Sequence, residues 1–82
     1  MDSRGGKVQR RLSDLKPGEG GKIVRITGPP SLRRRLLDMG LVKGAYIEVV
    51  RKAPLGDPME FLVKGYNLSL RKEECDNVYV ST

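Results

Sequence analysis

Residues 45–70, AYIEVVRKAPLGDPMEFLVKGYNLSL, decide the fold because strand patterns and turn residues follow one another within them. In residues 45–51 and 59–64, apolar side chains alternate with their neighbours, which is the period-two pattern of strands that bury one face. Residues 68–70 are a third, shorter strand candidate. The positions that this pattern assigns to the core are Ile47, Val49, Met59, Phe61 and Val63.

The links between these strands are short and restricted. Residues 52–58 contain two prolines and a glycine, which leave the connection little freedom. A tight hairpin turn is expected at 65–67, where Gly65 or Asn67 can take positive φ. The pattern therefore predicts short strands joined by tight links.

A single helix is predicted before these strands, at 31–39. Ser31 suits its N-cap, and Gly40 is placed for the left-handed residue that follows a helix. Leu41 can then fold back on the last turn, as in a Schellman ending. The apolar stripe at i, i+4 and i+7 consists of Leu32, Leu36 and Met39. These leucines predict a packed helix that carries its arginines on the solvent side.

Shorter elements complete the chain. Residues 22–27 predict a strand in which Ile23 and Ile26 are out of phase, so the strand either bulges or is buried on both faces. Residues 71–74 predict a helical turn, and residues 76–82 a closing strand. About five short strands cannot lie flat in so small a chain without exposing an apolar face. We therefore expect a mainly β fold, a small barrel with the helix as a plug at one end.

The composition bounds the class of protein. With 82 residues, the chain has room for one domain with a modest core. Half of the net charge of +6 lies in residues 1–11, which we expect to be a disordered basic tail before a domain at 12–82. No apolar run approaches the roughly 20 residues that span a bilayer, so direct membrane insertion is not expected. The single cysteine, Cys75, favours a core position and suits the reducing cytoplasm.

Catalytic chemistry has no support in the sequence. The chain has no histidine and no recognisable nucleophile–base pair, so neither an enzyme nor a cofactor is expected. The glycine-rich residues 18–22 fail as a P-loop, because the first glycine and the hydroxyl residue of that motif are missing. Four carboxylates are either a solvated acidic rim or, if they converge, a weak divalent-metal site. They are Asp57, Glu60, Glu73 and Glu74.

Two stretches are candidates for contact with a partner. Their residues are Arg33, Arg34, Arg35, Lys43, Pro54, Leu55 and Asp57. The arginine run is either a solvated helix face or an electrostatic patch for an acidic partner. Nucleic acid is not expected, because its readout usually needs a longer recognition helix or interleaved aromatic residues. Leu55, between two prolines, either folds back on the barrel or offers apolar area to a partner at little ordering cost.

Three segments, in this order and spacing, resemble the FeoA family, the small cytosolic proteins of bacterial ferrous iron uptake. They are RRLLDMGLVKG at 34–44, APLGDP at 53–58 and VKGYNLSLRKEE at 63–74. The resemblance covers about 12–80 and implies an SH3-like barrel that acts as an accessory or adaptor on the cytoplasmic GTP-binding domain of FeoB, the membrane transporter. A similar module forms the C-terminal domain of iron-dependent repressors, so a divalent-metal-responsive module is the alternative.

Overall fold

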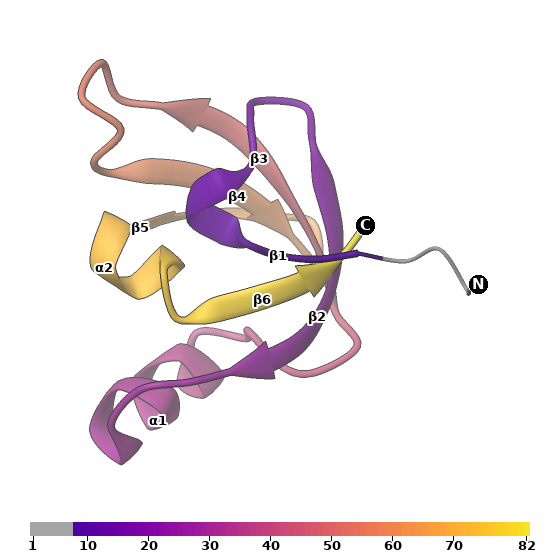
Figure 1. The fold of residues 1–82 in the computed structure, drawn as a ribbon, viewed down its shortest axis with the longest axis vertical. Coiled ribbons are helices and arrows are strands. Elements are labelled where there is room, and N and C mark those ends of the chain that lie inside the picture. Colours follow the sequence, from indigo (N-terminus) through magenta and orange to yellow (C-terminus); the bar gives the residue numbers. More distant parts are fainter. Residues whose placement is uncertain (1–7) are drawn as a thin grey trace.

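The chain forms an antiparallel sheet that curls into a small barrel (Figure 1). The computed structural model describes residues 8–82, and within them the strand order is β1-β6-β2-β3-β4-β5. The strands are β1 Gln9–Arg11, β2 Gly20–Ile26, β3 Tyr46–Lys52, β4 Met59–Val63, β5 Tyr66–Leu70 and β6 Val78–Ser81. The helical segments are η1 Leu12–Asp14, α1 Pro30–Asp38 and α2 Lys72–Cys75. The predicted mainly β barrel is confirmed, with six strands in this range where about five were expected.

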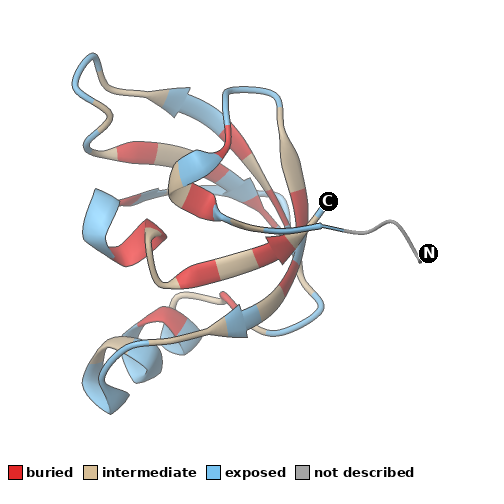
Figure 2. Ribbon diagram, viewed as in Figure 1, coloured by how far each residue is buried: buried red, intermediate tan, exposed pale blue. Residues whose placement is uncertain are grey.

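The barrel interior is filled by the positions that the alternation selects (Figure 2). On β3 and β4, the side chains of Ile47, Val49, Phe61 and Val63 are buried, whereas Leu62 lies on the outer face. Ile47 pairs with Val63 and Val49 with Phe61, before the register shifts between Val49 and Arg51, so these inward residues stack across the sheet. The predicted core of this hairpin is confirmed.

α1 begins one residue earlier than predicted. Its first residue is Pro30 and its N-cap is Pro29, so the expectation that Ser31 caps the helix is wrong. Proline suits the first helical position because its fixed φ is already helical and its missing N–H would have no partner there. Among residues 8–82, no helix is both long enough and apolar enough to cross a membrane.

The C-terminal end of α1 has the predicted Schellman geometry. Gly40 has a φ of +93°, and the Leu41 N–H donates to the Leu36 carbonyl at 3.0 Å. Leu36 is fully buried, and Leu32 and Met39 are partly buried against the core. The predicted apolar stripe therefore attaches α1 to the barrel.

β2 bends and pairs with two strands, which explains its glycines. Its first half pairs with β3 and its second half with β6. A Cβ at Gly20 would collide with the Ile47 carbonyl oxygen, and one at Gly21 with the Ser81 carbonyl oxygen. The glycine-rich stretch is therefore required for the close approach of three strands.

Two local details of the strands are decided by the structure. The pairing register shifts between Ile23 and Arg25, so β2 has the bulge that was one of the two alternatives. The β4–β5 turn consists of Lys64 and Gly65, with φ of 52° and 83°, and Asn67 lies within β5. The turn therefore sits one residue earlier than predicted, although Gly65 does take positive φ.

β1 lies inside the segment that the sequence predicts to be a disordered tail. That prediction is wrong for Gln9–Arg11, which pair with β6. Residues 1–7 of the predicted tail lie outside the described residues. The ordered domain therefore begins before residue 12.

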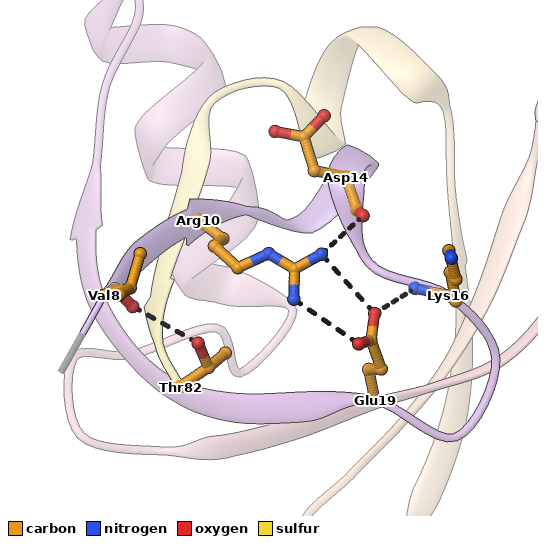
Figure 3. A network of polar contacts seen from close by, with 6 residues as sticks. All are labelled: Val8, Arg10, Asp14, Lys16, Glu19 and Thr82. Atoms are coloured by element: carbon orange, nitrogen blue, oxygen red, sulfur yellow. Dashed lines mark hydrogen bonds and ion pairs between the residues drawn. The ribbon is translucent and has the colours of Figure 1, made fainter. Parts of the chain in front are cut away.

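Polar contacts hold the segment that follows β1 (Figure 3). Arg10 donates to the Asp14 carbonyl at 2.9 Å and forms an ion pair with Glu19 at 3.4 Å. The Lys16 N–H donates to the Glu19 carboxylate at 2.7 Å. This backbone hydrogen bond, with the smaller effect of Arg10, lowers the pKa of Glu19. These contacts hold β1 and the segment that follows it, and the sequence pattern of β1 does not reveal them.

Cys75 is fully buried at the end of α2, which spans Lys72–Cys75 where 71–74 was predicted. Removal from water, together with the nearby Glu74 carboxylate, raises the pKa of the Cys75 thiol to about 12. In mildly alkaline buffer, we expect a thiol reagent such as DTNB to modify Cys75 only as fast as the chain unfolds. Labelling rates measured with and without guanidinium test this, and rapid labelling of the native chain would contradict the buried position.

Candidate partner-binding surfaces

The residues predicted to contact a partner fall into two groups at opposite ends of the molecule (Figure 1). α1, with the arginine run, lies at one end of the long axis, and the loop between β3 and β4 lies at the other. α2 sits between them and contacts both. Asp57 of the loop accepts a hydrogen bond from the Lys72 N–H at 3.1 Å, and Arg35 of α1 forms an ion pair with Glu74.

The β3–β4 loop, residues 53–58, presents Leu55 at its tip. The Leu55 residue is 93% exposed, so it does not fold back on the barrel. Backbone hydrogen bonds close the loop, because the Gly56 N–H donates to the Ala53 carbonyl at 2.7 Å and the Ala53 N–H to the Pro58 carbonyl at 3.0 Å. A large apolar side chain on an ordered loop gives up little conformational freedom when a partner covers it.

A groove runs between α1 and β2, with a volume of about 590 Å³, and we call it the α1–β2 groove. Its apolar lining consists of Ile23, Val24, Ile26, Pro30 and Leu37. Its charged residues are Arg25, Arg33, Arg34, Asp38 and Lys43. Three of the predicted partner residues therefore meet here, in a concave surface with four basic side chains and one acidic side chain.

Arg35 differs from the two arginines before it. Its guanidinium forms an ion pair with the nearly buried carboxylate of Glu74 on α2. The same carboxylate accepts a hydrogen bond from the Arg71 N–H at 2.7 Å, at the start of α2. Arg35 therefore ties α1 to α2, and it does not line the groove.

The four carboxylates considered as a weak metal site lie in different surroundings. Glu74 is nearly buried, and Glu60 lies on β4 with Arg51 3.4 Å away. Asp57 and Glu73 line one shallow hollow with Asp76, but the basic side chains of Arg71 and Lys72 line it as well. Within residues 8–82, no group of three or more carboxylate or thiol side chains is placed to hold a metal ion.

Leu37 and Arg25 are among the groove residues that the sequence did not indicate as partner contacts. Leu37 is 49% exposed, although it is an apolar residue of a helix that packs on the barrel. Its position outside the stripe of buried residues is the signal that would have identified it. Arg25 projects from β2, and its guanidinium lies 4.4 Å from the centre of the Tyr79 ring. No pattern around Arg25 distinguishes it from an ordinary exposed residue.

Comparison with known proteins identifies relatives of the whole domain. The family model of the FeoA domain matches residues 10–82. The chain is 44% identical over 70 residues to the Fe(2+) transport protein A/Fe(2+) transporter FeoB fusion protein of Porphyromonas gingivalis. This alignment covers 85% of the chain but only 8% of the relative, so the chain spans a small part of that protein's length.

Solved structures share the same architecture. A crystal structure of the iron uptake regulatory protein FeoA has a TM-score of 0.83 and 32% identity, covering 92% of this chain and 100% of that one. FeoA of Stenotrophomonas maltophilia, a prokaryotic SH3 domain protein in complex with zinc, has a TM-score of 0.74 and 28% identity, covering 87% of this chain and 88% of its own, and confirms the SH3-like prediction. A manganese-dependent transcriptional repressor, 16% identical over 90% of this chain and 41% of its own, shares the fold alone with a TM-score of 0.83. Because the family model spans nearly all of the described residues, this chain belongs to the FeoA family.

Proposed function

We propose that this chain is a non-enzymatic accessory protein of ferrous iron uptake, which docks in the cytoplasm on the GTP-binding domain of a FeoB-type transporter. One observation carries the proposal. In the P. gingivalis relative, a segment 44% identical to this chain belongs to a protein in which FeoA and FeoB are fused. A fusion of this kind keeps two domains together, as expected if they act at the same place. A function through binding also agrees with a chain that has no histidine and no recognisable nucleophile–base pair.

We assign the contact with the transporter to the β3–β4 loop. Leu55 is almost fully exposed, and burying one leucine contributes about 2 kcal/mol. The loop is already closed by hydrogen bonds, so little ordering cost offsets this gain. Because α1 lies at the opposite end of the molecule from the β3–β4 loop (Figure 1), a small interface centred on Leu55 leaves the α1–β2 groove free.

Replacing Leu55 with aspartate is expected to weaken binding to the isolated GTP-binding domain by roughly tenfold or more, because a charge replaces buried apolar area. Isothermal titration calorimetry with the two purified proteins measures the effect. Val8→Asp is the matched control, since it puts the same charge on another exposed aliphatic position, beside the C-terminus.

Each outcome of this titration has a defined meaning. Unchanged binding by Leu55→Asp, or equal weakening by Val8→Asp, would remove the loop from the contact. A wild-type chain that shows no saturable binding would remove the proposed function itself.

The alternative is a divalent-metal-responsive module. Zinc in the S. maltophilia relative is the observation that favours it. Against it, the chain resembles the repressor in fold alone, and among the described residues no three carboxylate or thiol side chains are placed to hold a metal ion. Zinc titration followed by NMR separates the two functions. Saturable shifts at Asp57, Glu60, Glu73 and Glu74 at micromolar zinc would favour the metal-responsive module, and we expect none.

A further inference from the structure

We infer that the α1–β2 groove is a second docking site, which takes a short acidic peptide segment of a partner protein that carries one or two apolar side chains. This inference goes beyond the proposed function, because it stands on the lining of the groove alone. α1, which lines the groove, lies at the end of the molecule opposite the β3–β4 loop that carries Leu55 (Figure 1). Occupation of one surface therefore does not block the other.

The charge of the groove selects an anionic occupant. Arg33 and Arg34 on α1, Arg25 on β2 and Lys43 after the helix line it, against the single carboxylate of Asp38. None of these four basic side chains forms an ion pair with another residue of the described range 8–82, and only Arg25 stacks on an aromatic ring, that of Tyr79. Several unpaired charges of one sign around a concave surface raise the local potential and attract the opposite charge. An acidic segment is the complementary partner.

The apolar part of the groove favours an occupant that carries an apolar side chain in addition to negative charge. Leu37 is 49% exposed, whereas the neighbouring Leu36 is fully buried. Val24 and Ile26 of β2 are half-buried and line the groove with Leu37. A bare phosphate would leave this apolar area in water, whereas a leucine or similar side chain would cover it. The lining therefore fits a peptide better than a small anion.

The size of the groove fits a short segment. The nine residues of α1 rise by about 13 Å, which is the length of about four extended residues. The volume of about 590 Å³ lies within the range of pockets that bind small ligands. A single nucleic acid strand would need aromatic side chains for stacking, and the lining contains none. A flat bilayer would rest on the rim without filling the groove.

The first test titrates the isotopically labelled full chain with the peptide Ac-EDELLEDE-NH2, followed by NMR. We expect saturable shifts centred on the amides of Arg25, Leu37 and Lys43, with a dissociation constant below about 1 mM. Two matched peptides, with serine for leucine or with lysine for each acidic residue, are expected to bind roughly tenfold more weakly or worse. Equal binding of either control peptide, an absence of saturation, or shifts centred elsewhere would overturn the inference.

Variants separate a specific groove from general attraction to a basic protein. Arg34→Glu is expected to weaken peptide binding about fivefold at low salt, and Asp38→Asn to strengthen it about twofold. A gain in affinity cannot arise from lost folding. Lys16→Glu makes the same charge change as Arg34→Glu, in the turn between η1 and β2 away from α1 (Figure 1), and is expected to have little effect. Equal weakening by both charge reversals would overturn the inference.

Lipid is the remaining occupant to be tested. Vesicles of phosphatidylcholine with phosphatidylglycerol are added to the labelled chain in place of the peptide. We expect no change in the amide signals of α1 or β2. Vesicle binding that depends on Arg34, without peptide binding, would replace the acidic segment by a membrane surface and overturn the inference.

Discussion

Replacing Phe61 with alanine is expected to lower the free energy of unfolding by about 4 kcal/mol. Phe61 is fully buried in the middle of β4, in register with Val49 of β3 and Leu68 of β5. Removing its ring leaves a cavity at the centre of the barrel and loses contacts to both neighbouring strands. Small domains are stable by only about 5–15 kcal/mol, so this one side chain accounts for a large fraction of the total.

Leu62→Ala is the matched control, because it removes a similar apolar side chain from the adjacent position. Leu62 is 39% exposed on the outer face, and its loss is expected to cost less than about 1 kcal/mol. Guanidinium denaturation of both variants measures the difference. A loss at Leu62 equal to that at Phe61 would mean that β4 presents its other face to the core, since a one-residue slip exchanges the two faces of a strand.

Gly40→Ala is expected to cost about 3 kcal/mol, of which positive φ accounts for only about 1–2 kcal/mol. The rest comes from its neighbour. A Cβ at Gly40 would collide with the hydroxyl of Tyr66, which donates a hydrogen bond to the Met39 carbonyl. Either the hydroxyl moves and loses this hydrogen bond, or the end of α1 moves away from β5.

Gly44→Ala measures the cost of the backbone strain without the collision. Gly44 has the same φ of +93°, but an added Cβ meets no atom within 4 Å. We therefore expect Gly44→Ala to cost less than Gly40→Ala, and Tyr66→Phe to restore part of the stability in the Gly40→Ala background. Thermal and chemical denaturation of these variants measures the free energy of unfolding of each, which gives a double-mutant cycle for Gly40 and Tyr66. Equal costs at the two glycines would contradict the close packing of Tyr66 on Gly40.

The sequence predicts the central strands well because their burial is periodic. In a strand with one buried face, every second side chain points to the core, so the apolar residues at alternate positions around Phe61 are also the buried ones. β1 has no such pattern. Gln9–Arg11 form a strand because β6 pairs with them, and because Arg10 reaches Glu19 and Asp14. The pairing with β6 joins segments far apart in the sequence, which no local pattern records.

The sequence indicates which residues are candidates for partner contact, but it does not show how their side chains are arranged in space. Successive residues on a helix point about 100° apart, so the run of arginines cannot share one direction. Arg33 and Arg34 line the α1–β2 groove, whereas Arg35 meets Glu74, which follows far along the chain. The exposure of Leu55 likewise depends on how the loop closes, which is settled by hydrogen bonds between Ala53, Gly56 and Pro58.

The proposed docking is tested most directly by titrating the isotopically labelled chain with the unlabelled GTP-binding domain of a FeoB-type transporter. NMR then follows each backbone amide of the described range. We expect saturable broadening centred on residues 53–58, with the amides of α1 unaffected. Changes centred on α1 alone would contradict the assignment to the β3–β4 loop. An absence of saturable change along the whole chain would contradict the accessory function.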